Sequence, residues 1–199
     1  MDFWIKVGIL SLTLSGCESI DKNLSTKNLN IEITDEIKFS PYAMQTISID
    51  DEKEYLFYLN SVNGSLHKWS DTNGIKVIID NGKVIKTYGL NNDFDIKYYQ
   101  GFIDMEPSQA YIRFLNPESG YMQIFFSYDI IKEGSMEKII DNSLFNYTLI
   151  KESFEVPLIK WSGTNYYWVD IENDVWLTKQ IIDPYDKKIR IKVLKKYSD

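Results

Sequence analysis

The chain has 199 residues, of which 44% are hydrophobic and 26% charged, a balance typical of a single globular domain that buries its own core. Its 22 basic and 29 acidic residues give a net charge of −7, which argues against a surface that binds the phosphates of nucleic acid. Aromatic residues make up 15% of the chain, and this share favours strands over long helices.

Residues 1–16 are predicted to be a lipoprotein signal peptide. A short leader with one lysine precedes an apolar run that is too short to span a bilayer, and Leu14-Ser15-Gly16-Cys17 resembles a bacterial lipobox. In lipoproteins of this kind Cys17 would become the first mature residue and carry the acyl chains that anchor the protein in a membrane. A plain secretory signal with a chance cysteine is the alternative.

Residues 17–38 are predicted to be the lipidated Cys17 and a polar tether, whose second half could form a short helix before a single β domain at 39–199. Cys17 is the only cysteine, so its acylation would leave no thiol for a disulfide or a metal site. Glu18 stands where an aspartate usually retains Gram-negative lipoproteins in the inner membrane. We therefore expect an outer-membrane lipoprotein that faces the periplasm.

The first strand patterns lie in the region 54–92. Residues 54–60 are apolar on both faces and predict a central strand, and residues 66–70 predict the next strand. The clearest hairpin covers residues 74–92, where two runs rich in Val, Ile and Thr flank Asp80-Asn81-Gly82. Asn and Gly tolerate positive φ, so a tight reversal is favourable there.

Beyond residue 92 strands follow one another without a convincing amphipathic helix. They are predicted at 94–99, 110–115, 121–131, 149–154, 158–161, 166–170, 175–182 and 189–194, with a shorter strand opening at Glu133-Gly134-Ser135. Roughly ten to twelve short strands with short links indicate an all-β sandwich or barrel with a meander topology. The pattern leaves open whether the sheet closes, because closure depends on register and shear.

Several blocks of residues resemble the capsule and exopolysaccharide lipoproteins of the GfcB/YjbF type, in order as well as in spacing. They are Trp69, Ile78-Ile79, Asn81-Gly82-Lys83-Val84-Ile85-Lys86-Thr87, Gly89-Leu90-Asn91, Tyr167-Trp168-Val169-Asp170 and residues 178–180. The resemblance runs from about residue 41 to 194 and includes the lipobox. Residues 171–174 depart from it where a glycine turn is expected, and residues 105–140 match only loosely.

This resemblance implies a periplasmic domain folded as a large antiparallel meander sheet, curved into a deformed or partly open barrel. It also implies a role in the assembly or export of a capsular polysaccharide or exopolysaccharide. No catalytic residue or cofactor is carried over from the family. The partners expected are the membrane, through the acyl chains on Cys17, together with polysaccharide and export proteins.

The residues themselves offer little chemistry. His67 is the only histidine, so a metal site built from several histidines is excluded. No G-x-S-x-G motif accompanies it, and it is interpreted as a surface or packing residue. The glycines never group into a phosphate-binding loop. Two carboxylates suffice for glycoside cleavage, and the paired acids are Asp50-Asp51-Glu52, Asp170 with Glu172, and Asp183 with Asp186. As turn residues they are expected to be solvated, with Asp170 capping its turn.

Aromatic side chains give the best indication of a binding surface. Trp and Tyr rings stack on the C–H faces of sugars, and four rings on predicted strands are the candidate glycan-binding residues, namely Trp69, Tyr166, Trp168 and Trp176. Packing in the core is the alternative for each of them.

Three functions therefore stay open from the sequence. The first is a non-enzymatic lipoprotein that assists polysaccharide assembly or export by binding glycan or export proteins. The second is a carrier of lipid-linked material, which requires an apolar cavity. The third is a periplasmic glycan hydrolase, which requires two carboxylates that converge in a cleft.

Overall fold

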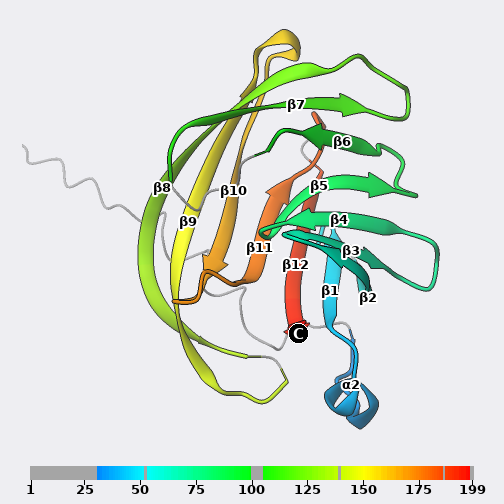
Figure 1. The fold of residues 1–199 in the computed structure, drawn as a ribbon, viewed down its shortest axis with the longest axis vertical. Coiled ribbons are helices and arrows are strands. Elements are labelled where there is room, and N and C mark those ends of the chain that lie inside the picture. The colour runs from blue at the N-terminus through cyan, green and yellow to red at the C-terminus, as the bar shows by residue number, and fades with distance from the viewer. Residues whose placement is uncertain (1–30, 52, 100–104, 139, 186, 198–199) are drawn as a thin grey trace, which may run out of the picture.

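The computed structural model describes residues 31–51, 53–99, 105–138, 140–185 and 187–197. Its strands pair antiparallel and form a closed barrel (Figure 1). A helix, α2 (Asp35–Phe39), precedes the barrel, and Thr34 caps it by accepting a hydrogen bond from the Ile37 amide. The strands are β1 (Met44–Ile49), β2 (Lys53–Asn63), β3 (Leu66–Ser70), β4 (Lys76–Asp80), β5 (Lys83–Tyr88), β6 (Phe94–Lys97), β7 (Ser108–Phe114), β8 (Met122–Glu137), β9 (Leu144–Val156), β10 (Trp161–Val169), β11 (Val175–Ile181) and β12 (Lys188–Lys195).

The topology is a meander whose ends meet. Every strand pairs with its neighbours in sequence, and β1 also pairs with β12, so that Ile47 lies opposite Ile191. The prediction of an all-β antiparallel meander is confirmed. The sheet closes completely, which the sequence left undecided. The long strands β8, β9 and β10 form one curved wall of the barrel, and β2 to β7 lie across from it (Figure 1).

The hairpin β4–β5 forms where the sequence predicts it. Asn81 and Gly82 have φ values of 45° and 80°, so both turn residues adopt the left-handed conformation that a two-residue hairpin requires. The register shifts between Ile78 and Ile79. Ile78 lies opposite Lys86 and Ile79 lies opposite Val84, so β5 contains one extra residue between these two pairs. This bulge at β5 turns Thr87 towards the interior, where it is fully buried.

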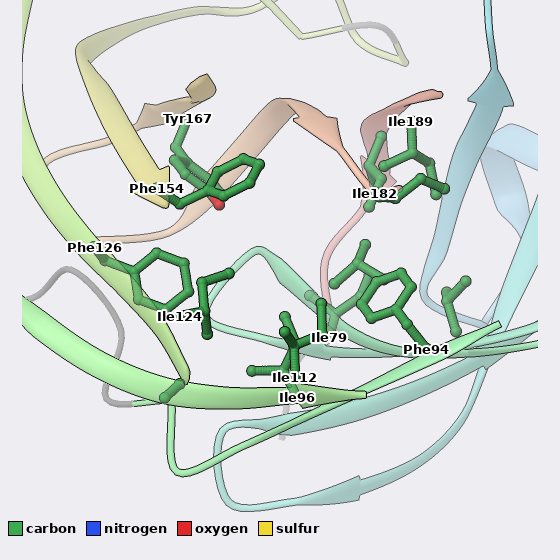
Figure 2. Packing of buried hydrophobic residues seen from close by; sticks show 14 of the residues in the cluster. Ile79, Phe94, Ile96, Ile112, Ile124, Phe126, Phe154, Tyr167, Ile182 and Ile189 are labelled. Atoms are coloured by element: carbon green, nitrogen blue, oxygen red, sulfur yellow. The ribbon is translucent and has the colours of Figure 1, made fainter. Parts of the chain in front are cut away.

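The core fills the interior of the barrel. On β8, buried Met122, Ile124, Phe126 and Tyr128 alternate with more exposed residues, as expected of a strand with one face inward. Figure 2 shows Phe126 and Phe154 from the curved wall pointing towards side chains of the opposite strands. The side chains labelled on those opposite strands include Ile79, Phe94, Ile96 and Ile112.

Three local predictions differ from the structure. Residues 44–49 carried no predicted strand, yet they form β1, the strand that completes the barrel. Residues 158–161 were predicted as a strand, but Pro157–Ile159 form a short 3-10 turn, which Lys160 ends with a φ of 52°. Glu133-Gly134-Ser135 continue β8 instead of opening a separate strand. No helix among the described residues is long and apolar enough to cross a membrane.

Candidate functional site

A buried polar centre lies inside the barrel, between β5 and β9. Lys83 and Glu152 form an ion pair there, and their side chains are 5% and 0% exposed. Glu152 also accepts hydrogen bonds from Asn165 Nδ2 at 2.6 Å, Tyr167 Oη at 3.1 Å and Tyr99 Oη at 2.9 Å. Each oxygen of this buried carboxylate therefore has a partner, which is the condition for a charge to be tolerated in a core.

The electrostatics of this centre follow from its burial. Desolvation lowers the pKa of Lys83, and the Glu152 carboxylate opposes this shift. Burial, reinforced by the negative charge of Glu152, raises the pKa of both Tyr99 and Tyr167 well above the ordinary value. Both phenols therefore stay protonated and donate to Glu152. The Lys83 ammonium also lies 4.8 Å from the centre of the Phe126 ring.

Gln180 joins the β4–β5 turn to its own strand, β11, close to this centre. Its Oε1 accepts from the Val84 amide at 3.0 Å, and its Nε2 donates to the Gly82 carbonyl at 2.8 Å and to Thr178 Oγ1 at 2.9 Å. Residues from three blocks on which the family resemblance rests, at 81–87, 167–170 and 178–180, thus meet in the interior. This centre is enclosed by the core, and its contacts link β5, β9 and β10 inside the barrel.

An open cleft of about 300 Å³ lies at the end of the barrel where β3 and β11 begin. We call it the tryptophan cleft, because Trp69 and Trp176 both line it; the other residues used below are Gln45, His67, Asp174, Lys196 and Tyr197. The His67 ring lies 6.4 Å from those of Trp69 and Tyr197, and burial lowers the pKa of His67. The walls of the cleft thus combine aromatic rings with amide and charged groups, a mixture that suits a sugar.

Two donors in the wall of this cleft lack partners among the described residues. They are Nε1 of Trp69, a residue that is 4% exposed, and Nε2 of Gln45, which is 2% exposed. A buried donor without an acceptor costs about 1–3 kcal/mol. A ligand oxygen or a water that reached these nitrogens would recover that cost.

The structure brings together two of the four candidate glycan-binding residues. Trp69 and Trp176 share the cleft, although Trp176 is also held by a hydrogen bond from its Nε1 to Asp170 Oδ2 at 2.7 Å. Tyr166 lies elsewhere, in a groove on the outer face of β10–β12. Trp168 is 0% exposed and packs in a second apolar cluster with Leu149 and Leu177, so we leave it out of the binding surface.

The predicted acidic pairs are mostly engaged in turns and ion pairs. Asp170 Oδ1 accepts from the amides of Glu172 and Asp174, so Asp170 caps its turn as expected. Oxygens of these three acids lie within 4.8 Å of one another, and Lys196 forms ion pairs with all three. The lysine supplies the positive charge that this cluster needs.

The other acidic candidates are arranged in a similar way. Asp183 Oδ1 accepts from the amides of Tyr185 and Lys187, and its Oδ2 accepts from Asn92 Nδ2 at 2.9 Å. Asp50 Oδ1 accepts from the Lys188 amide, and Asp51 pairs with Arg190. Glu52 and Asp186, like Cys17, lie outside the described residues.

Sequence reasoning missed the contribution of β1 to the cleft. Gln45 lies on β1, for which no strand was predicted, although the alternation of Ile47, Ser48 and Ile49 was a signal for it. It also missed the buried role of Glu152, whose strand alternates inward-facing Ile150, Glu152 and Phe154. A charged residue at a core position of this pattern was the available clue.

Comparison with known families and structures agrees with this architecture. A family model described as "Group 4 capsule polysaccharide lipoprotein gfcB, YjbF" matches residues 21–194. The match ends where the resemblance read from the sequence ends, and it begins earlier, within the predicted tether. No curated protein matches the chain.

Solved structures resemble this chain in fold. The crystal structure of the hypothetical lipoprotein YmcC from Escherichia coli superposes with a TM-score of 0.71 at 13% identity, covering 90% of this chain and 93% of that one. A lipoprotein from Parabacteroides distasonis gives a TM-score of 0.43 at 13% identity, covering 77% of this chain and 93% of its own. At this identity the likeness to YmcC shows a shared fold.

Proposed function

Because this chain belongs to the family of group 4 capsule polysaccharide lipoproteins, we propose that it assists the assembly or export of a capsular polysaccharide by binding glycan in the tryptophan cleft. Membership of the family gives the process, which is related to capsule polysaccharide. Binding, as opposed to catalysis, is our proposal. Its place of action would be the periplasmic face of the outer membrane, where acyl chains on Cys17 would anchor it.

The observation that carries the proposal is the pair of unpartnered donors in an aromatic cleft. Trp69 from β3 and Gln45 from β1 both line the cleft, and each carries a buried N–H group without a partner among the described residues. Glycan hydroxyl and ring oxygens accept hydrogen bonds, and the flat C–H faces of sugars pack on aromatic rings. A sugar unit in the cleft would satisfy both requirements after small side-chain movements.

The two alternatives have less support. A carrier of lipid needs a large apolar cavity. The pocket that Trp161 lines among the described core residues holds only about 10 Å³, and the groove of about 510 Å³ that Tyr166 lines on the outer face is also lined by Lys179, Lys188 and Arg190. A hydrolase needs two free carboxylates in a cleft, whereas Asp174, which lines the cleft, forms an ion pair through Oδ2 with Lys196, and both oxygens of nearby Asp170 accept hydrogen bonds from its turn, Trp176 and Lys196. The observed contacts of the described residues therefore favour binding.

The test is a titration of the full-length lipoprotein, in a nonionic detergent, with the polysaccharide of its own cell. We expect a change in tryptophan fluorescence, and we expect Trp69→Phe to weaken binding about tenfold through loss of the indole donor and part of the ring contact. Trp161→Phe is the matched control, because Trp161 is equally buried and lies outside the cleft. Binding unchanged by Trp69→Phe would contradict the proposal.

A genetic test addresses the process. Deletion of the gene should reduce surface polysaccharide, and the wild-type gene should restore it more fully than the Trp69→Phe gene. Restoration to the same level by both genes, at equal protein amounts, would argue that the cleft is not where the protein acts.

A further inference from the structure

A groove of about 510 Å³ runs along the outer face of β10, β11 and β12. We call it the basic groove and define it by Tyr166, Lys179, Lys188 and Arg190. Across the strands Tyr166 lies opposite Lys179, and Lys179 lies opposite Arg190. Their neighbours Gln180 and Ile189 are buried on the inner face, so these alternate side chains point outward.

The groove concentrates positive charge without enough negative charge to balance it. Like charges directly opposite one another on paired strands are destabilising, and this applies to Lys179 and Arg190. Asp51 pairs with Arg190 at 2.7 Å. Among the described residues no carboxylate forms an ion pair with Lys179 or Lys188. This excess of positive charge is confined to the groove, whereas the chain as a whole carries a net charge of −7.

The environment of Lys179 reflects this imbalance. Its pKa is lowered, first by partial burial and then by the positive charges of Arg190, Lys192 and Lys188, and the negative charge of Asp51 opposes this shift. An anion placed between Lys179 and Arg190 would relieve the repulsion. The half-buried ring of Tyr166 at the same place offers an apolar surface beside the charges.

We propose that the basic groove binds the anionic groups, carboxylates or phosphates, of an acidic polysaccharide. This inference rests on the proposed function and names the class of glycan. The volume of the groove lies within the range of about 300–1,000 Å³ that is usual for small-ligand sites. A polysaccharide is favoured over an anionic membrane because the site is a concave groove, which a single extended chain can enter and a planar bilayer surface cannot.

The experiment uses the full-length lipoprotein in a nonionic detergent and measures binding of an oligogalacturonate by calorimetry, with an uncharged oligosaccharide of equal length beside it. We expect the acidic ligand to bind more tightly, with an affinity that falls as salt is added. Lys179→Gln together with Lys188→Gln should weaken its binding about five- to twentyfold, because the double variant removes two of the three positive charges that define the groove.

The matched control carries Lys68→Gln and Lys76→Gln, which remove the same charge on β3 and β4 outside the groove. Equal weakening in both double variants, or none in the groove variant, would overturn the proposal. So would a groove variant that loses binding to vesicles of anionic phospholipid while it still binds oligogalacturonate, since that result assigns the groove to a membrane.

The groove and the cleft can be tested separately. The fluorescence response to the polysaccharide of the cell, and its dependence on Trp69, is measured on the groove variant as well. If this response remains and oligogalacturonate binding is insensitive to Lys179 and Lys188, the groove proposal alone fails. If the dependence on Trp69 is absent while the groove variant still loses the acidic ligand, the cleft proposal alone fails.

Discussion

Lys83 and Glu152, which lie 69 residues apart in the chain, form a buried ion pair across the interior of the barrel. Lys83 comes from β5 and Glu152 from the curved wall on the other side of the core (Figure 1). Removing two charges from water costs free energy, and the hydrogen bonds from Asn165 and Tyr167 offset part of that cost. The pair can form only when the two walls have met.

We predict that breaking this pair from one side destabilises the fold. Lys83→Met leaves the Glu152 charge buried without its cation, and the free energy of unfolding should fall by about 3–5 kcal/mol. Adding Glu152→Gln to this variant removes the second charge and should recover part of the loss. Lys86→Met is the control, since Lys86 is more exposed and its ion pair with Asp95 should contribute less than about 1 kcal/mol. Urea unfolding measures all three, and a Lys83→Met loss no larger than that of Lys86→Met would contradict the prediction.

A second prediction concerns alkaline pH. The pKa of Tyr167 is raised in the folded protein, so above pH 10.0, the ordinary value, the unfolded chain releases a proton that the folded chain keeps. The free energy of unfolding is therefore unaffected by ionisation of this tyrosine below pH 10.0. Above pH 10.0 it falls, by up to about 1.4 kcal/mol per pH unit for each such tyrosine. Lys83, whose pKa is lowered, acts in the opposite direction up to its ordinary value of 10.5, so the fall is clearest above that pH.

Unfolding by urea between pH 8 and pH 11.5 measures this effect. Tyr167→Phe is less stable at neutral pH because its hydrogen bond to Glu152 is lost, but its stability should decline less steeply with pH. Identical slopes for the two proteins would show that Tyr167 does not contribute.

A third prediction compares two turn glycines with positive φ. A Cβ atom on Gly82 would lie 2.7 Å from a side-chain atom of Val175, whereas one on Gly74 would meet nothing within 4 Å. Gly74→Ala should cost about 1–2 kcal/mol for the left-handed backbone alone. Gly82→Ala should cost a further 1–3 kcal/mol, roughly, from overpacking against β11. Thermal unfolding of both variants measures the difference, and equal losses would show that Val175 moves aside freely.

A fourth prediction concerns the membrane anchor, for which Cys17 and Glu18 are the residues to change. Cys17→Ala should abolish incorporation of labelled palmitate and release the protein from the membrane fraction. Glu18→Asp should leave the acylation intact and move the protein from the outer to the inner membrane. Retention of Cys17→Ala in the membrane would contradict lipid anchoring, and an unchanged location of Glu18→Asp would contradict the sorting role of Glu18.

Local signals in the sequence predicted most strands well. The β4–β5 hairpin is an example, because its turn depends only on the positive φ that the adjacent residues Asn81 and Gly82 readily adopt. The extent of β8 and β9 was harder to predict, since their pairing continues from Phe125 to Glu137 through a register shift at residue 131. Strand β1 carried a local signal in the alternation of Ile47, Ser48 and Ile49, but its pairing with β12, which closes the barrel, depends on residues at the far end of the chain.

The binding sites were predictable in part. Aromatic composition pointed to Trp69 and Trp176, and the cleft contains both. The burial of Trp168 and the partnership of Lys83 with Glu152 depend on which faces of distant strands meet, and a single sequence does not contain that information. The basic groove is similar, because Lys179 and Arg190 become neighbours only through the β11–β12 register.

The pairing of β1 with β12 also bears on how copies of this protein behave beside one another. Exposed strand edges are templates on which further chains can add, and the pairing of β1 with β12 removes the two edges that the ends of a meander would otherwise expose. Many copies held by lipid on one bilayer would be crowded into a thin layer. In that layer the mutual pairing of the first and last strands would reduce the backbone surface through which neighbouring copies could polymerise.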